Sequence, residues 1–99
     1  MKKLSFSERC YEILRSVPRG KLTTYRDIAE ALGTKAYRAV GNCMHQNPNA
    51  PIVPCHRVIK SNGEIGGYAF GVNKKIALLK AEGISVKEGK VVNYQDLLV

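Results

Sequence analysis

Three prolines within seven positions, at Pro48, Pro51 and Pro54, constrain the fold of this 99-residue chain more than any other feature. Proline holds φ near about −65° and has no amide hydrogen, so a run of prolines cannot continue a helix or occupy a central strand. Segment 47–59 must therefore begin as an extended loop between two parts of the chain. The apolar side chains that would anchor this loop in the core are Ile52, Val53, Val58 and Ile59.

An amphipathic helix is predicted near the N-terminus. Ser5 followed by Glu8 forms a capping-box pattern, and Pro18 and Gly20 end the periodicity that follows. The apolar residues at helical spacing are Phe6, Cys10, Ile13, Leu14 and Val17.

Two further helices, joined by a tight turn, are predicted between about residues 24 and 46. Thr24 with Asp27 resembles a helix start, and Gly33 suits the left-handed position after a helix end. The apolar face of this helix comprises Tyr25, Ile28, Ala29 and Leu32. A second pattern runs from Lys35 to about Gln46 before Asn47-Pro48 ends it. Two helices with this connection are a candidate helix-turn-helix.

The chain after the loop combines short elements. Residues 61–63 indicate a turn, residues 66–71 a glycine-rich aromatic loop, and residues 86–92 a small hairpin. Between them a last helix is predicted from about Asn73 to Glu82, with an inward face of Ile76, Leu78 and Leu79. The predicted fold is therefore one domain over residues 1–99, mostly α with small β elements, and it resembles a winged helix.

The net charge of +8 points to a polyanionic partner. The excess is concentrated in residues 33–75, where Glu64 is the one acidic residue. Lys35 and Arg38 lie near the start of the second helix of the pair, away from its apolar stripe, where a recognition helix meets nucleic acid.

The cysteines favour a reducing compartment. Cys10, Cys43 and Cys55 cannot all pair, and their spacing is not that of a disulfide-stabilised secreted fold. The first residues lack the apolar run of an export signal, and no stretch of about 18 apolar residues suggests a membrane span. We expect a monomer that is cytoplasmic, associated with the nucleoid, or nuclear.

Cys55 and His56 are the candidate reactive pair. They are adjacent on the proline-rich loop, outside any periodic apolar face, and Arg57 follows them, so cationic neighbours favour a thiolate. The structural alternative, a buried cysteine that acts as a small hydrophobic residue, fits Cys10 and Cys43 better. A zinc site would have to use Cys43, His45, Cys55 and His56, whose spacings lack the two-residue gaps of tetrahedral ligand pairs. We therefore expect neither a metal nor a cofactor.

The sequence Pro54-Cys55-His56-Arg57-Val58 resembles the active-site motif of methylated-DNA-protein-cysteine S-methyltransferases, the 6-O-alkylguanine-DNA alkyltransferase family. Further matches lie in the same order: Tyr25, Arg38-Ala39-Val40-Gly41, Asn47-Pro48, Gly67-Tyr68 and Glu82-Gly83. The resemblance covers about residues 6–86, which correspond to nearly the whole catalytic domain of that family. The N-terminal domain that family members usually carry has no counterpart in the resemblance.

The resemblance implies a DNA repair protein that flips 6-O-alkylguanine out of duplex DNA and transfers the alkyl group irreversibly to Cys55, once per molecule. Cys55 would be activated through a water and His56, with Glu82 orienting the imidazole. Asn47 would tie the recognition helix to the active-site loop, and Tyr25 would crowd the 3′ phosphate and face the guanine.

The resemblance also implies two sets of binding residues. The guanine pocket would be lined by Tyr25, Val58, Tyr68 and Ala69. Contacts with the minor groove would come from Tyr25, Lys35, Tyr37, Arg38, Ala39, Gly41 and Asn42, with Arg38 filling the gap that the flipped base leaves.

Two departures and two alternatives accompany this interpretation. Tyr37 is bulkier than the small residue expected against a narrow groove, which bears on how closely the helix meets the groove. Ala69 and Phe70 replace smaller or polar residues of some relatives, which bears on the size of the alkyl group that the pocket accepts. One alternative is an alkyltransferase-like protein, which binds lesions without transfer and usually carries Trp in place of the reactive cysteine; Cys55 argues against it. The other is a winged-helix transcription regulator, which would leave Cys55 and His56 without a role.

Overall fold

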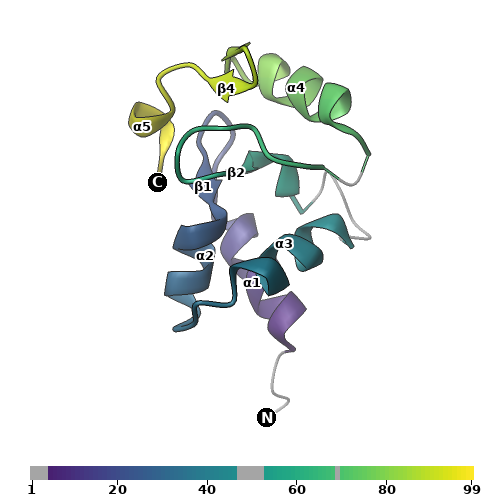
Figure 1. Cartoon of the computed structure of the whole chain (residues 1–99), viewed down its shortest axis with the longest axis vertical. Helices are drawn as coiled ribbons and strands as arrows, with labels where there is room; N and C mark the ends of the chain where they lie inside the picture. Colours follow the sequence, from purple (N-terminus) through teal and green to yellow (C-terminus); the bar gives the residue numbers. More distant parts are fainter. Residues whose placement is uncertain (1–4, 47–52, 69) are drawn as a thin grey trace.

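Short helices are the main regular elements of the fold. The computed structural model describes residues 5–46, 53–68 and 70–99 (Figure 1). In chain order the elements are α1 (Phe6–Arg15), β1 (Thr23–Thr24), α2 (Tyr25–Ala31), α3 (Tyr37–His45), the 3-10 helix η1 (Cys55–Arg57), β2 (Val58–Ile59), α4 (Val72–Ala81), β3 (Val86–Lys87), β4 (Lys90–Val91) and α5 (Tyr94–Leu97). The predicted class, mostly α with small β elements around a helix-turn-helix, is confirmed.

The predicted helix starts of α1 and α2 are confirmed by their caps. The Ser5 hydroxyl oxygen accepts a hydrogen bond from the Glu8 amide at 3.1 Å, and Thr24 Oγ1 accepts one from the Asp27 amide at 3.0 Å. Each bond satisfies an amide that has no partner within its helix, so both starts are locally encoded.

The ends of α3 and α4 differ from the prediction. Helix α3 begins at Tyr37 rather than at Lys35, because Thr34 Oγ1 accepts the Ala36 amide hydrogen at 3.1 Å and holds the preceding residues in a turn. Helix α4 begins at Val72 and ends at Ala81, so that Glu82 is its C-cap residue.

Two pairs of very short strands complete the fold. Strand β1 pairs in parallel with β2, with Thr23 opposite Val58, and this pairing brings the end of the active-site loop beside the start of α2. Strands β3 and β4 form the predicted hairpin, and its turn residues Glu88 and Gly89 both have positive φ, at 53° and 77°. Positive φ at both positions is typical of a type I′ turn.

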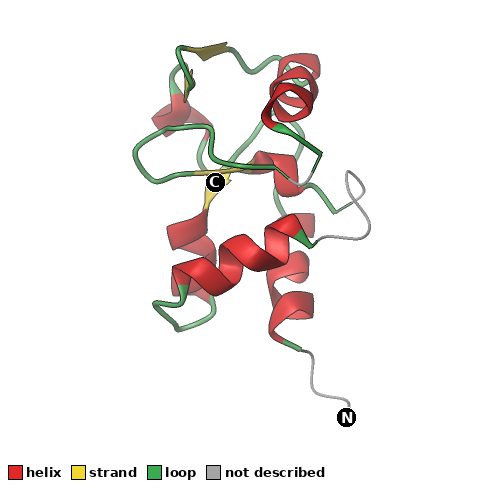
Figure 2. Ribbon diagram, turned by 45° about the vertical axis from the view of Figure 1, so that its right-hand side comes forward, coloured by secondary structure: helices red, strands yellow, loops and turns green. Residues whose placement is uncertain are grey.

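The core consists of two clusters. The first joins α1, α2, α3 and the Cys55 segment, and its buried members are Cys10, Leu14, Ile28, Ala29, Val40, Cys43, Met44, Val53, Cys55, Val58 and Tyr68. The second lies among α4, the hairpin and the C-terminus, and comprises Leu22, Ile59, Ile65, Leu79, Ile84 and Val91. Segment 55–59 passes between the two, so η1 lies at the junction of a lower and an upper part of the molecule (Figures 1 and 2).

Several sequence predictions concern residues outside the described ranges. These residues are Asn47, Pro48, Pro51, Ile52 and Ala69. Within the described ranges, no helix combines the length and apolarity needed to cross a membrane.

Candidate active site

Cys55 lies at the start of η1 and is buried. Its side chain is part of the first core cluster, with the residue 2% exposed, and its amide donates to the Val53 carbonyl at 2.8 Å, which fixes the backbone before the turn. A thiolate at Cys55 would raise the pKa values of Tyr25, Tyr68 and Lys75, so these three groups lie within electrostatic range of the sulfur. The nucleophile predicted from the sequence is therefore enclosed by ionisable groups rather than by apolar side chains alone.

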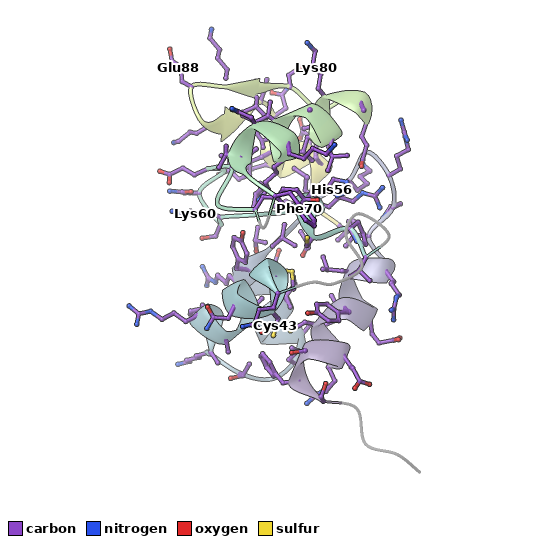
Figure 3. The ribbon with its side chains drawn as sticks, turned by 90° about the vertical axis from the view of Figure 1, so that its right-hand side faces the viewer. Cys43, His56, Lys60, Phe70, Lys80 and Glu88 are labelled. Atoms are coloured by element: carbon purple, nitrogen blue, oxygen red, sulfur yellow. The ribbon has the colours of Figure 1, made fainter. Side chains whose placement is uncertain are left out.

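His56 and Glu82 form a buried hydrogen-bonded pair next to this cysteine. His56 Nε2 lies 2.5 Å from Glu82 Oε2, and the two side chains are 3% and 6% exposed. His56 lies between the upper and lower parts of the molecule, well away from Lys80 and Glu88 at the upper end (Figure 3). Among the described residues, the buried His56 Nδ1 has no hydrogen-bond partner.

The charge states of the pair follow from burial and its neighbours. Burial lowers the pKa of His56 from its ordinary value, although the bond to Glu82 opposes this effect. Burial alone would raise the pKa of Glu82, but hydrogen bonds from Arg57, Gly20 and His56 together lower it. A neutral imidazole beside a carboxylate carries its proton on Nε2, which leaves the lone pair of Nδ1 as an acceptor.

Arg57 anchors Glu82. Its Nε donates to Glu82 Oε1 at 2.9 Å and its Nη1 donates to the Val17 carbonyl at 2.8 Å, while the Gly20 amide donates to the same Oε1 at 3.0 Å. These bonds explain how an anion is tolerated at the C-terminal end of α4, where the helix dipole disfavours it. The sequence indicated Arg57 as a cationic neighbour of Cys55, and its two-sided hold on Glu82 and Val17 was not foreseen.

Tyr25 forms one wall beside the cysteine. It is the first residue of α2, and its hydroxyl donates to the Gly67 carbonyl at 3.4 Å. Burial raises the pKa of Tyr25 to about 12, so its phenol stays protonated at neutral pH. Val58 and Tyr68 are also buried nearby, and the Tyr68 ring meets Phe70 edge to face at 5.7 Å between centroids. The structure thus brings together three of the four residues predicted to line a pocket.

Lys75 is the residue of this region that the sequence interpretation missed. It is 0% exposed, and its ammonium donates to the Val58 carbonyl at 2.6 Å and to the Gly67 carbonyl at 3.1 Å. A lysine in a helix is usually assigned to solvent. The available signal was its spacing, because Lys75 precedes the core residue Leu79 by one helical turn.

The predicted recognition helix borders an open cleft. Residues Tyr25, Tyr37, Arg38, Gly41, Lys60 and Gly67 line a hollow of about 320 Å³. An adjoining hollow of about 400 Å³ is lined by Tyr25, Arg26, Tyr37, Lys60, Ser61 and Asn62. Lys35, Arg38 and Asn42 are exposed, whereas Ala39 and Gly41 are half-buried. Tyr37 is 43% exposed and lines both hollows, so it stands at the mouth of the cleft rather than in the core.

The other two cysteines lie in the helical core. Cys10 is 0% and Cys43 6% exposed, and the Ser7 hydroxyl lies 3.2 Å from Cys43 Sγ. Burial raises the pKa of Cys10 to about 12, with Cys43 adding to the effect, so Cys10 remains a thiol. Within residues 5–46, 53–68 and 70–99, no three His, Cys, Asp or Glu side chains are grouped to hold a metal ion.

Fold and site together define a helix-turn-helix domain that carries a buried cysteine beside a histidine-glutamate pair. Residues 5–84 match the family model described as 6-O-methylguanine DNA methyltransferase, DNA binding domain. The chain belongs to this family, as its active-site motif indicated.

Three similar proteins illustrate the relationship. The methylated-DNA–protein-cysteine methyltransferase of Metallosphaera sedula is 48% identical over 83 residues, which are 84% of this chain and 52% of that protein. The structure of Mycobacterium tuberculosis OGT in complex with DNA has a TM-score of 0.77 at 42% identity, and the match covers 83% of this chain and 51% of that chain. This chain therefore spans about half the length of these two proteins.

A third match is of nearly equal length. The structure of S. pombe Atl1 in complex with damaged DNA containing O6-carboxymethylguanine has a TM-score of 0.84 at 28% identity, covering 100% of this chain and 98% of that chain. A domain of this size and fold therefore exists in a protein whose structure was determined with a damaged guanine.

Proposed function

We propose that this protein binds duplex DNA, flips out 6-O-alkylguanine and transfers the alkyl group to Cys55, once per molecule. The observation that carries the proposal is the buried pair of His56 and Glu82 next to Cys55, with His56 Nδ1 as a hydrogen-bond acceptor. The family match and the DNA complexes of the similar proteins support the choice of substrate.

Recognition would use the helix-turn-helix and the cleft beside it. Arg38 projects from the first turn of α3 at the cleft, where its side chain can enter the minor groove and fill the space of an extruded base. Lys35, Tyr37, Ala39, Gly41 and Asn42 would follow the groove. Because minor-groove contacts are degenerate, such a protein can search any sequence for damage.

The flipped base would enter between Tyr25 on one side and Val58 and Tyr68 on the other. The Tyr25 hydroxyl stays protonated at neutral pH and can donate a hydrogen bond to the base. The backbone of Val58 and the side chain of Tyr68 would line the pocket, together with Ala69. Asn47 would link α3 to the active-site loop.

Transfer is a displacement at the alkyl carbon. His56 Nδ1 accepts the thiol proton of Cys55 through a water, and Glu82 stabilises the resulting imidazolium. The sulfur forms a bond to the carbon as the carbon–O6 bond breaks, and the electron pair of that bond goes to the guanine. The guanine then takes up a proton, so a thioether and an unmodified base are formed from a thiol and an alkylated base. No step regenerates the thiol, so each molecule reacts once.

Intact-mass spectrometry after incubation with a duplex that carries one 6-O-methylguanine tests this proposal. The expected result is a gain of one methylene on Cys55 with restoration of guanine; Cys55→Ser removes the gain but keeps binding to the lesion, and Cys43→Ser retains the gain. Selective binding without a mass change would instead assign the protein to the alkyltransferase-like class. If the protein neither gains mass nor prefers the lesion, but binds one DNA sequence more tightly than others, it would be assigned to the winged-helix transcription regulators.

A further inference from the structure

We infer that Tyr94 is a positioning residue for DNA binding, which holds the turn of residues 60–63 in place as one wall of the cleft beside the recognition helix α3. This inference rests on the proposed function, because it concerns the same DNA-binding surface. The close contact between Tyr94 and Gly63, together with the place of the turn in the cleft, carries it.

The turn of residues 60–63 forms one side of the hollow of about 400 Å³. Lys60, Ser61 and Asn62 line this hollow together with residues of α2 and α3, among which Arg26 adds a second cation. Both cations are exposed and paired with exposed glutamates, and such pairs contribute little, so a phosphate can replace the glutamate. Because the DNA backbone is lined with phosphate charges, it is attracted to this hollow. The distance of the turn from α3 therefore determines how closely DNA can enter.

Tyr94 lies directly against the backbone of this turn. Gly63 has a φ of 91°, and a Cβ atom added there would lie 2.5 Å from Cδ1 and 2.6 Å from Cε1 of the Tyr94 ring. The Gly63 amide donates to the Lys60 carbonyl at 2.9 Å, which closes the turn, and the Gly63 carbonyl accepts from the Val91 amide of β4 at 2.9 Å. The ring thus packs on the residue that closes the turn, so the turn cannot shift toward it.

The segment that carries Tyr94 is itself anchored. Leu22, directly before β1, donates its amide to the Leu97 carbonyl at 2.9 Å and accepts from the Val99 amide at 3.0 Å. The C-terminal end of the chain therefore lies beside β1 (Figure 1). Tyr94 is half-buried and packs against the second core cluster. Helix α5 is thus a fixed support for the turn.

The contact bears on binding rather than on the reaction at the cysteine. Among the described residues, those that line the hollow beside the turn include neither Cys55 nor His56. Removal of the Tyr94 ring should therefore weaken the hold on duplex DNA while Cys55 reacts with free 6-O-methylguanine at an unchanged rate.

The affinity for a fluorescein-labelled, undamaged duplex, measured by fluorescence anisotropy, tests this role. Tyr94→Ala removes the ring and Tyr94→Phe keeps it, whereas Ile84→Ala truncates a buried residue of the same core cluster that lines a different hollow. We expect Tyr94→Ala to weaken binding about tenfold, the scale of one lost charge-assisted hydrogen bond. Tyr94→Phe and Ile84→Ala should match the unchanged protein. A folded Tyr94→Ala protein with unchanged affinity, or an equal loss in Ile84→Ala, overturns the inference.

Coupling between Tyr94 and Lys60 distinguishes positioning from a general loss of stability. If Tyr94 acts by placing the turn, Tyr94→Ala should cost less affinity in a Lys60→Ala background, so that the double variant loses less than the two single losses combined. Lys60 is exposed, so its truncation should leave the fold intact. Fully additive losses contradict the inference.

A second pair of variants tests the contact from the side of the turn, in case Tyr94→Ala does not fold. Gly63→Ala places a methyl group against the Tyr94 ring, whereas Gly89→Ala, at a φ of 77° with nothing within 4 Å, reproduces the backbone strain alone. Gly63→Ala should bind the duplex more weakly than Gly89→Ala, and equal affinities overturn the inference. Binding of undamaged DNA requires no transfer, so failure of the proposed reaction would appear separately, as an unchanged mass after incubation with the methylated duplex.

Discussion

His56 Nε2 and Glu82 Oε2 lie 2.5 Å apart, and this bond orients the imidazole so that its other nitrogen is buried and unpartnered among the described residues. Glu82 is itself held by Arg57 and the Gly20 amide. The direction in which His56 can accept a proton is therefore determined by residues from three parts of the chain.

Glu82→Gln should slow alkylation of Cys55. The amide keeps the shape of the carboxylate but cannot stabilise an imidazolium, so we expect a loss on the order of 10²-fold in transfer rate and a higher pH midpoint. Transfer from a methylated duplex between pH 5 and 9 measures both. Glu12→Gln, at an exposed residue of α1, is the control. An unchanged pH profile would remove Glu82 from the relay.

Arg38→Ala should impair repair in duplex DNA far more than reaction with the free base 6-O-methylguanine. The exposed guanidinium borders the cleft and has no part in the proposed proton transfer, so its loss should affect base extrusion and not chemistry. We expect a loss of about tenfold or more with duplex, the scale of one charge-assisted hydrogen bond. Arg9→Ala removes an exposed charge from α1 and serves as the control. Equal losses with both substrates would contradict the assignment.

Acidification should destabilise the protein in two stages. The pKa values of His56 and Glu82 are both lowered in the folded state, so the unfolded chain binds more protons at each residue. Stability should fall first below about pH 6.5, where unfolded histidine becomes protonated, and again below about pH 4.3, where unfolded glutamate does. Urea unfolding at pH 7.5, 5.5 and 4 measures this dependence. His56→Gln should flatten the first stage, and a variant with an unchanged slope there would show that another group is responsible.

Gly66→Ala should displace Tyr25. Gly66 has a φ of 71°, and a methyl group there would lie 3.1 Å from the Tyr25 hydroxyl. Gly89 has a similar φ of 77° with nothing within 4 Å, so Gly89→Ala reproduces the backbone cost of about 1–2 kcal/mol without the contact. We expect similar melting temperatures for the two variants and a lower transfer rate for Gly66→Ala alone. Equal transfer rates would mean that the position of Tyr25 is not limiting.

The sequence predicted those parts of the fold that have local signals. The caps at Ser5 and Thr24, and the hairpin over residues 86–92, were predicted because their side chains or conformations act within a few residues. The two-residue strands β1 and β2 have no periodicity of their own, and pairing between Thr23 and Val58 spans much of the chain. That pairing could not be inferred from local pattern.

The site divides in the same way. Cys55 and His56 were found from a contiguous motif, and Glu82 from its match to the same family. Lys75 was missed because its two acceptors are backbone carbonyls, which every residue carries and no sequence pattern marks. The two bonds of Lys75 join residues that lie 17 and 8 positions apart, so they depend on the tertiary fold.

The passage of segment 55–59 between the two core clusters has a consequence for partly unfolded molecules. Cys55 belongs to the cluster around α1, α2 and α3, whereas Glu82 follows α4 in the other half. A molecule in which α4 and the hairpin open while the three helices remain would keep its DNA-facing helix pair and lose Glu82 and Lys75 from the cysteine. Such a molecule could bind DNA without reacting at Cys55. The fraction of DNA-bound molecules that react therefore measures how cooperatively the two halves of the molecule unfold.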